Sequence, residues 1–395
     1  MLDALLFIAA GCVLGTITGL LPGLHSNTVS FIALAFIGGD MNFALMIISM
    51  NVVQTFVDFV PNILLGAPDN ESFVSVLPGH HFFIQGEGIY AIRIAVAGAL
   101  LGTIVSIPVG IIFFIFLIRT GEFISKIMVL LLAIALLSIV ARERGMERKV
   151  CALAVIALSG ALGIVALRGF AFGDALFPLI SGFFGISGII YSTWSENVHI
   201  AQKDTFRKIN GVKLAASSAL GTIAAAIIAV VPSMGPSQAA AVAKELGGRI
   251  SRSGFLAMIG AIGAGSVIFS TVVLFATGKI RSGAAAAVNE LGGLGIEQML
   301  IIFAAALASA GFGALVAEAA GIEAAQAIQK FDYRKISAGL LLGMTLVVLL
   351  TNGLMGVLLL AISSAIGIFT IASKVNRSAC MAFLMVPTIM FYAGL

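Results

Sequence analysis

Two short segments interrupt long apolar stretches in the same way, and they constrain the fold more than any other feature of the chain. Segment 19–28 reads GLLPGLHSNT, and segment 229–238 reads AVVPSMGPSQ. In both, a proline followed by small polar residues ends a helical run, because proline lacks a backbone donor and clashes inside a helix. The recurrence indicates that the chain contains two related halves.

Other landmarks return in the same order, at offsets between 204 and 212 residues. The motif GAPD at 66–69 is echoed by GKIR at 278–281, and SGALGI at 159–164 is echoed by SSAIGI at 363–368. Arg168 precedes Pro178 by ten residues, as Arg377 precedes Pro387. A duplicated membrane protein with a broken helix in each half is typical of a secondary transporter, with the substrate held between the halves.

The composition places the chain in the membrane. Of its 395 residues, 60% are hydrophobic and 10% are charged, whereas soluble domains contain about 25% charged residues. The run IIFFIFL at 111–117 lacks the alternation of a transmembrane β-barrel. We therefore expect an all-α polytopic membrane protein, with spans at 42–66, 88–118, 120–141, 148–167 and 174–192 and at 254–277, 296–328, 336–351, 353–371 and 378–394.

A broken pair of helical segments precedes each set of five spans. The pairs are 4–21 with 26–38, and 214–231 with 236–247, and the sequence leaves open whether their members span or re-enter the membrane. The expected organisation is a first membrane repeat (1–192), a cytoplasmic connector (193–213) and a second membrane repeat (214–395). Each repeat then contains a broken or re-entrant pair and about five transmembrane helices.

Loop charges predict that the two repeats have inverted topology. The loop at 142–149 carries four basic residues, while its counterpart near 351–353 carries none. The loop at 330–335 is basic, while its counterpart holds only Arg119 and Lys126. Because basic loops face the cytoplasm, we expect a plasma-membrane protein with the connector inside and both termini extracytoplasmic.

The two Pro-containing segments are the first candidate site. Polar residues after the break can cap the next helix, and free amides at a helix start attract an anion. Two helices that are merely kinked at proline and repaired by Ser and Thr are the alternative. The candidate substrate-binding residues are Pro22, Gly23, His25, Ser26, Asn27, Thr28, Pro232, Ser233, Gly235, Ser237 and Gln238.

A polar stripe within span 42–66 is the candidate ion-coupling site. Asn51, Thr55, Asp58 and Asn62 fall on one helical face. A carboxylate inside the apolar slab is costly, so it should face a cavity, pair with a base or carry a proton. A structural ion pair is the alternative, as is a position at the membrane interface if the helix is shorter. Ser266 and Ser270 occupy the matching face in the second half.

The polar segment 66–72 and its partner 278–283 form a third feature. The first offers the carboxylates and amide of Asp69, Asn70 and Glu71, and the second offers the cations Lys279 and Arg281. We assign the acidic segment to ion coupling and the two cations to the substrate anion. An ordinary salt bridge between such groups is the alternative.

Glycines at a spacing of four residues predict close helix packing. Gly11, Gly15 and Gly19 form one such series, and Gly98 and Gly102 form another. Small residues at this spacing let helix backbones approach closely in lipid.

Several function classes lack their sequence signals. No phosphate-binding loop, Ser/His/Asp set or basic nucleic-acid-binding face is visible. His80 and His81 have no third metal ligand near them, and Cys12, Cys151 and Cys380 are scattered. We expect no catalytic residues, no metal site, no nucleic acid and no cofactor beyond Na⁺ or H⁺ as a coupling ion.

Several motifs together resemble a known family. LPGL at 21–24 followed by SNT, ILLGAPD at 63–69, AISSAIGI at 361–368, NRSACM at 376–381 and MVP at 385–387 are similar to the large membrane subunit of the tripartite tricarboxylate transporters (TctA-like), in its short stand-alone prokaryotic type. The resemblance implies a cation-coupled importer of organic anions whose site is lined by Pro22, Gly23, Asn27, Thr28, Pro232, Gly235 and Ser237. It leaves open a small membrane subunit, an extracytoplasmic binding protein and a homodimer.

Two other functions are alternatives to an organic-anion transporter. A polyprenyl-phosphate translocase would place a lipid phosphate between the facing helix starts, near Arg93, Lys279 and Arg281. A channel or scaffold without coupled transport is the third class. Asp58 discriminates between them, because a cation-coupled carrier should depend on this carboxylate and a lipid flippase should depend more on the basic residues.

Overall fold

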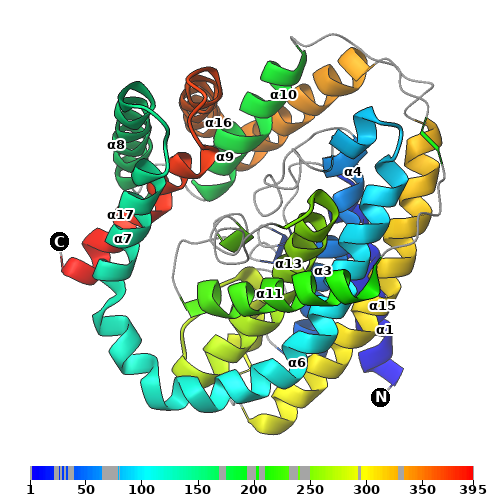
Figure 1. The fold of residues 1–395 in the computed structure, drawn as a ribbon. Helices are drawn as coiled ribbons and strands as arrows, with labels where there is room; N and C mark the ends of the chain where they lie inside the picture. The colour runs from blue at the N-terminus through cyan, green and yellow to red at the C-terminus, as the bar shows by residue number, and fades with distance from the viewer. Residues whose placement is uncertain are drawn as a thin grey trace. The chain divides into compact units, whose positions relative to one another are not determined.

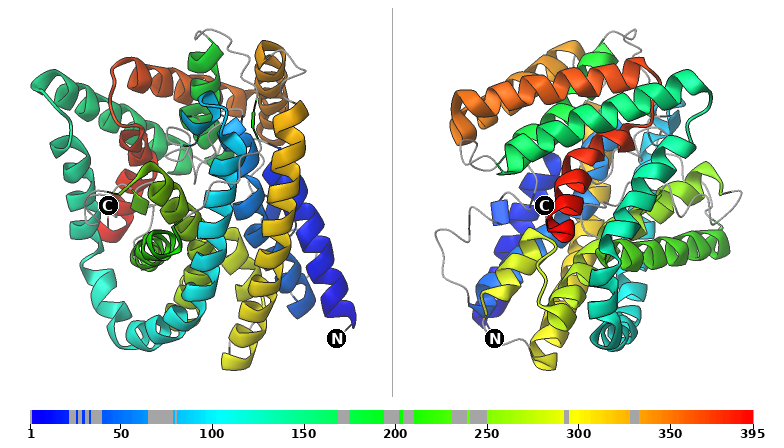
Figure 2. Two further views of the ribbon diagram at one scale, coloured as in Figure 1. Left: turned by 45° about the vertical axis from the view of Figure 1, so that its right-hand side comes forward. Right: turned by 90° about the vertical axis from the view of Figure 1, so that its left-hand side faces the viewer.

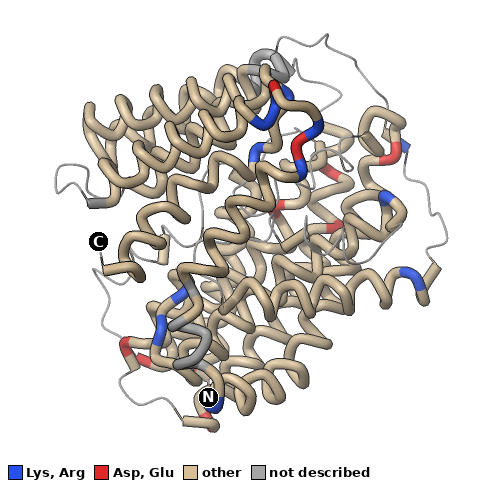
Figure 3. The backbone as a smooth tube through the Cα atoms, turned by 60° about the vertical axis from the view of Figure 1, so that its left-hand side comes forward, with Lys and Arg blue, Asp and Glu red and all other residues tan. Residues whose placement is uncertain are grey.

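The structure is a computed structural model. It describes residues 2–21, 26, 29–30, 33, 40–64, 79, 81–168, 175–193, 202–203, 210–230, 239–240, 250–291, 295–327 and 333–394. Within these ranges the chain forms helices and no strands, and eight helices are long and apolar enough to cross a membrane. Long stretches of helix carry no Lys, Arg, Asp or Glu (Figure 3). The predicted all-α polytopic membrane fold is confirmed, and the inverted topology of the repeats stays a prediction.

The chain divides into two compact units, and each draws on both predicted halves. The first unit comprises residues 1–121, 199–230 and 236–330, and the second comprises 122–198, 231–235 and 331–395. Each unit therefore combines a stretch from before the connector with a stretch from after it. The division into a repeat at 1–192 and a repeat at 214–395 stays a prediction about sequence relationship.

The first unit is built around two nearly enclosed helical spans. Its helices are α1 (Leu2–Leu20), α3 (Met41–Val57), α4 (Phe59–Leu64), most of α6 (Gly88–Lys126), α11 (Gly211–Val230), α13 (Arg252–Thr277), α14 (Gly283–Asn289) and α15 (Ile296–Ala327) (Figure 1). In the most apolar stretch of the span formed by α3 and α4, 94% of the residues are buried, and in that of α13 89% are buried. The corresponding share is 28% to 44% in α1, α6, α11 and α15. The two central spans can therefore carry polar groups that would be costly against lipid.

Small residues let the surrounding helices approach the central ones. A Cβ added at Gly11 would meet the main-chain oxygen of Met46 on α3, and one at Gly98 would meet that of Ala257 on α13. A Cβ at Gly15 or Gly102 would likewise meet backbone atoms of the facing helix, and one at Gly19 would lie 2.8 Å from Val57 Cβ. The predicted packing role of both glycine series is confirmed.

The second unit contains the remaining helices. They are α7 (Met128–Ala141), α8 (Met146–Arg168), α9 (Leu176–Ile180), the π-helix η1 (Ser181–Ile186), α10 (Ser187–Thr193), α16 (Tyr333–Ala372), the 3₁₀-helix η3 (Arg377–Met381) and α17 (Ala382–Ala393). Helix α8 lies alongside α16 (Figure 2, right) and packs against α17, while α9, η1 and α10 pack against α16.

The packing in the second unit is reciprocal between the predicted halves. A Cβ at Gly163 of α8 would meet the main-chain oxygen of Phe383 in α17. A Cβ at Gly367 of α16 would lie 2.6 Å from the main-chain oxygen of Phe183 in η1. In each case a glycine of one half admits the backbone of a phenylalanine from the other half.

Most predicted spans match the observed helices within a few residues, with one clear difference. Helix α6 continues to Lys126, so the span predicted at 120–141 is wrong at its start and helix α7 begins only at Met128. The sequence between Arg119 and Lys126 contains no proline, and the helical backbone is left only at Ile127, with φ −93° and ψ 6°. Conversely, Gly353 has φ 62° and ψ −160°, and it divides α16 where two spans were predicted to meet.

Candidate functional site

The predicted polar stripe lies on the most enclosed span of the first unit. Helix α3 starts at the N-cap Asp40, whose carboxylate accepts a 2.7 Å hydrogen bond from the Phe43 amide. It ends at Val57, and Asp58 forms a turn before α4. The main-chain amide of Asp58 donates to the main-chain oxygen of Gln54, and that of Asn62 donates to the main-chain oxygen of Asp58. The helical path therefore continues through the turn. All four stripe residues, Asn51, Thr55, Asp58 and Asn62, are buried.

Helix α13 carries the matching polar face from the second half of the chain. The N-cap of α13 is Ser251, and Gly278 ends the helix in the left-handed conformation at φ 67°. Ser270 is buried on this helix, and its hydroxyl lies 3.0 Å from that of Ser282, the N-cap of α14. The loop between α13 and α14 thereby brings a third hydroxyl, that of Ser282, to the polar face that carries Ser266 and Ser270.

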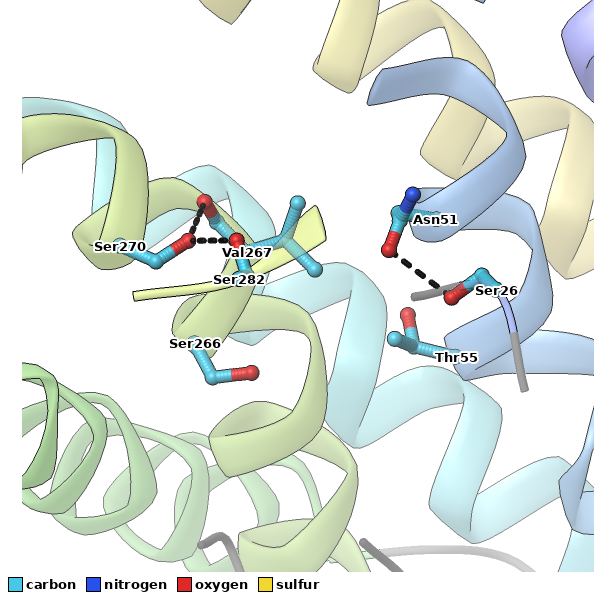
Figure 4. Close-up of a pocket in the computed structure, with 7 residues that line it drawn as sticks. All are labelled: Ser26, Asn51, Thr55, Ser266, Val267, Ser270 and Ser282. Carbon is cyan, nitrogen blue, oxygen red and sulfur yellow. Dashed lines mark hydrogen bonds between the residues drawn. The ribbon is translucent and has the colours of Figure 1, made fainter. Parts of the chain in front are cut away.

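A small polar cavity lies between these two faces, wholly within the first unit. Its volume is about 30 Å³. Side chains from the first half approach it from one side and side chains from the second half from the other (Figure 4). The lining residues are Ser26, Asn51, Thr55, Ser266, Val267, Ser270 and Ser282.

Ser26 connects the first Pro-Gly segment to this cavity. Its amide donates a 2.6 Å hydrogen bond to Gln54 Oε1, and its hydroxyl donates a 2.8 Å hydrogen bond to Asn51 Oδ1. The Asn51 amide group in turn donates to Ser30 Oγ and to the main-chain oxygen of Ile47. The start of the segment after the break is therefore fixed to α3 by buried hydrogen bonds.

The predicted cations in the loop after α13 lie elsewhere. Arg281 Nη2 donates a 3.0 Å hydrogen bond to the main-chain oxygen of Val230, the last residue of α11. Cations are favourable at a helix C-terminus, where carbonyl groups lack intrahelical partners. Neither Lys279 nor Arg281 lines the cavity, and neither does Asp58. Arg281 thus contacts the end of the helix that precedes the second Pro-containing segment.

The remaining predicted site residues lie outside the described residues. They are Pro22, Gly23, His25, Asn27, Thr28, Asp69, Asn70, Glu71, Pro232, Ser233, Gly235, Ser237 and Gln238. Their roles stay predictions. Among the residues that are described, no three His, Cys, Asp or Glu side chains gather in a way that could hold a metal ion.

Sequence reasoning missed two members of this site and one ion pair. Gln54 lies three residues from Asn51, and this helical spacing could have identified it. Ser282 could not be found, because only the fold returns it to Ser270. Arg93 and Glu318 form an ion pair of 2.8 Å between α6 and α15, although 225 residues separate them.

Comparison with known proteins identifies related chains. A family model described as the tripartite tricarboxylate transporter TctA family matches residues 5–382. The uncharacterized protein MJ1079 of Methanocaldococcus jannaschii is 27% identical over 399 residues, covering 98% of each chain. No solved structure matches the chain. The matching family is one of transporters, which confirms the expectation that the chain is not an enzyme.

Proposed function

Because the chain belongs to the tripartite tricarboxylate transporter TctA family, and is thus the membrane component of a transporter of that type, we propose that it carries a carboxylate-type organic anion by secondary transport coupled to Na⁺ or H⁺. The small membrane subunit and the extracytoplasmic binding protein of a tripartite system belong to the same proposal. The substrate site lies where the broken helices of the two halves converge.

The polar cavity of the first unit is the observation that supports this proposal. Both halves contribute to it, and Ser26 brings the segment after the first break directly to its wall. Arg281 holds the end of the helix before the second break, and its neighbour Ser282 lines the same cavity. The two predicted breaks are thus linked to one buried polar centre.

The chemistry of the broken helices suits a carboxylate. Free amides at a helix start and the helix dipole both favour an anion. In this proposal Asn27, Thr28 and Ser237 supply such groups, and Asp58 on the stripe responds to the coupling ion. Binding in an enclosed low-dielectric site makes each of these interactions stronger than it would be in water.

Ligand-induced stabilisation of the purified protein tests the proposal. Thermal unfolding is measured with di- and tricarboxylates, with polyprenyl phosphates and at varied pH, with and without Na⁺. We expect carboxylates to raise the unfolding temperature. Ser26→Ala should weaken that effect, because it removes the hydroxyl that fixes the segment after the first break to Asn51, while keeping the amide that bonds Gln54. Ser253→Ala at the start of α13 is the matched control and should retain it.

Two outcomes would replace the proposal. Stabilisation by polyprenyl phosphates but not by carboxylates would support the lipid-carrier translocase instead. If carboxylates stabilise Ser26→Ala and Asn27→Ala as much as they stabilise the unmodified protein, the substrate site lies away from the first break.

A further inference from the structure

The hydroxyl groups around the cavity have already donated their hydrogens elsewhere. Thr55 donates to the main-chain oxygen of Val52 at 2.7 Å, and Ser266 donates to that of Gly263 at 2.7 Å. Ser270 donates to the main-chain oxygen of Val267 at 2.9 Å. A hydroxyl has a single hydrogen and two acceptor lone pairs, so these three oxygens can offer only lone pairs to the cavity.

The other three polar lining residues follow the same rule. Ser26 donates to Asn51 Oδ1, and both hydrogens of the Asn51 amide are used on Ser30 and Ile47. With the Ser270 hydrogen directed to Val267, the 3.0 Å contact between Ser282 and Ser270 uses the Ser282 hydrogen. Among the residues that the structure describes, six of the seven that line the space present side-chain oxygens to it (Figure 4). The hydrogen bonds given above use the hydrogens of these six side chains.

From this pattern we infer that the cavity is a binding site for a monovalent cation such as Na⁺. Acceptor oxygens attract a cation and repel an anion. The six oxygens belong to Ser26, Asn51, Thr55, Ser266, Ser270 and Ser282, and oxygen ligands are those that hard cations prefer.

The described lining residues carry no charge, and this indicates the charge of the ion. Ca²⁺ and Mg²⁺ sites use carboxylates, and none of the described residues that line this cavity carries one. A buried double charge without an anionic ligand would be costly. The described lining side chains are hydroxyls, one amide and one valine, and this set of neutral oxygens favours a metal cation over a proton. Asp58 lies three residues beyond Thr55, about one helical turn away, and its position favours a single positive charge.

The size of the cavity separates this site from the substrate site. A cavity needs about 10–15 Å³ to hold one water, so a volume of about 30 Å³ admits a bare or singly hydrated ion and excludes a tricarboxylate. The role of the cation as the coupling ion rests on the proposed function, because Ser26 also belongs to the first Pro-Gly segment. A cation here would place positive charge beside an anion held by that segment.

Cation binding without any substrate tests the inference. The purified full-length protein is titrated with NaCl, LiCl and KCl at constant ionic strength maintained with choline chloride, and thermal unfolding and ²²Na⁺ binding are measured. We expect saturable stabilisation by at least one of these ions. Thr55→Val, which replaces the hydroxyl by a methyl group, and Ser270→Ala should each weaken apparent affinity at least tenfold.

A buried threonine on α13 supplies the matched control. Thr271 also donates its hydroxyl hydrogen to a main-chain oxygen, that of Val267 at 3.0 Å, but it does not line the cavity. Thr271→Val should retain the affinity of the unmodified protein. Should Thr55→Val fail to fold, Ser266→Ala replaces it, since that hydroxyl donates to the main-chain oxygen of Gly263 within its own helix.

The remaining outcomes separate the cation site from the proposed function. Unchanged cation affinity in Thr55→Val and Ser270→Ala would overturn the site. So would stabilisation by anions alone, or no dependence on any of the three cations, even where carboxylates still bind and the proposed function stands. Cation binding that is lost in both variants, in a protein that binds no carboxylate, would support the site and refute the proposed function.

Discussion

Arg377 Nη2 donates a 2.7 Å hydrogen bond to the main-chain oxygen of Phe184, inside the π-helix of the second unit. The same nitrogen lies 3.1 Å from the main-chain oxygen of Phe183 and 2.9 Å from Ser187 Oγ. The guanidinium also lies over the Phe184 ring, 5.6 Å from its centroid. π-Helical turns are rare and often functional, and here one arginine from the other predicted half satisfies the carbonyl groups of such a turn.

Replacing Arg377 by Lys should destabilise this π-helix. Lysine keeps the positive charge but lacks the planar fork and the stacking surface of a guanidinium. Because hydrogen bonds to charged groups contribute about 1.5–3 kcal/mol each, we expect a loss of about 2–3 kcal/mol in stability. Thermal unfolding and hydrogen exchange of residues 181–187 measure it. Lys374→Gln, at an exposed position three residues earlier, is the control, and equal exchange in both variants would contradict the assignment.

Replacing Gly98 by Ala should disrupt the contact between α6 and α13. The added methyl group would meet the main-chain oxygen of Ala257, and overpacking of this kind costs about 1–3 kcal/mol. Gly311→Ala on α15 is the control, because nothing lies within 4 Å of its Cβ position and Ala favours helix over Gly by about 1 kcal/mol. Denaturation in detergent should therefore show a loss of stability for Gly98→Ala and a gain for Gly311→Ala. A neutral Gly98→Ala variant would mean that the two helices are further apart.

Replacing Asp58 by Asn should uncouple transport from its driving ion. The carboxylate is buried in the turn between α3 and α4, where its loss removes a negative charge from the ion path. We expect substrate accumulation in proteoliposomes to fall by about tenfold or more, equivalent to about 1.4 kcal/mol, while exchange persists. Asp40→Asn at the N-cap of the same span should be silent, because Asn caps as well as Asp. Full accumulation by Asp58→Asn would remove this residue from the coupling site.

Cysteine labelling of intact cells tests the predicted orientation. Met146 and Val212 are 77% and 81% exposed, and the charge pattern places both on the cytoplasmic side. In a Cys151→Ser background, Met146→Cys and Val212→Cys should react with an impermeant maleimide only after permeabilisation. Leu2→Cys, near the terminus predicted to lie outside, should react in intact cells. If positions 146 and 212 react in intact cells, the predicted orientation is wrong and these positions lie outside the cell.

The sequence by itself determined the helical membrane fold and most helix limits. These depend on local properties: apolar length, the break near Gly353, and the helix-ending effect of proline. The stripe of Asn51, Thr55 and Asp58 was also readable, because helical spacing alone places these residues on one buried face.

Only the tertiary structure decided which parts of the two halves form each compact unit and where the polar cavity lies. Ser282 reaches Ser270, and Arg93 reaches Glu318, through packing between segments that no local pattern links. The direction of each hydroxyl hydrogen likewise depends on which carbonyl the fold brings near, as Ser26 shows by donating to Asn51. A cavity that offers lone pairs rather than donors is thus a property of the packed helices, since the same serines and threonines in a sequence can serve either role.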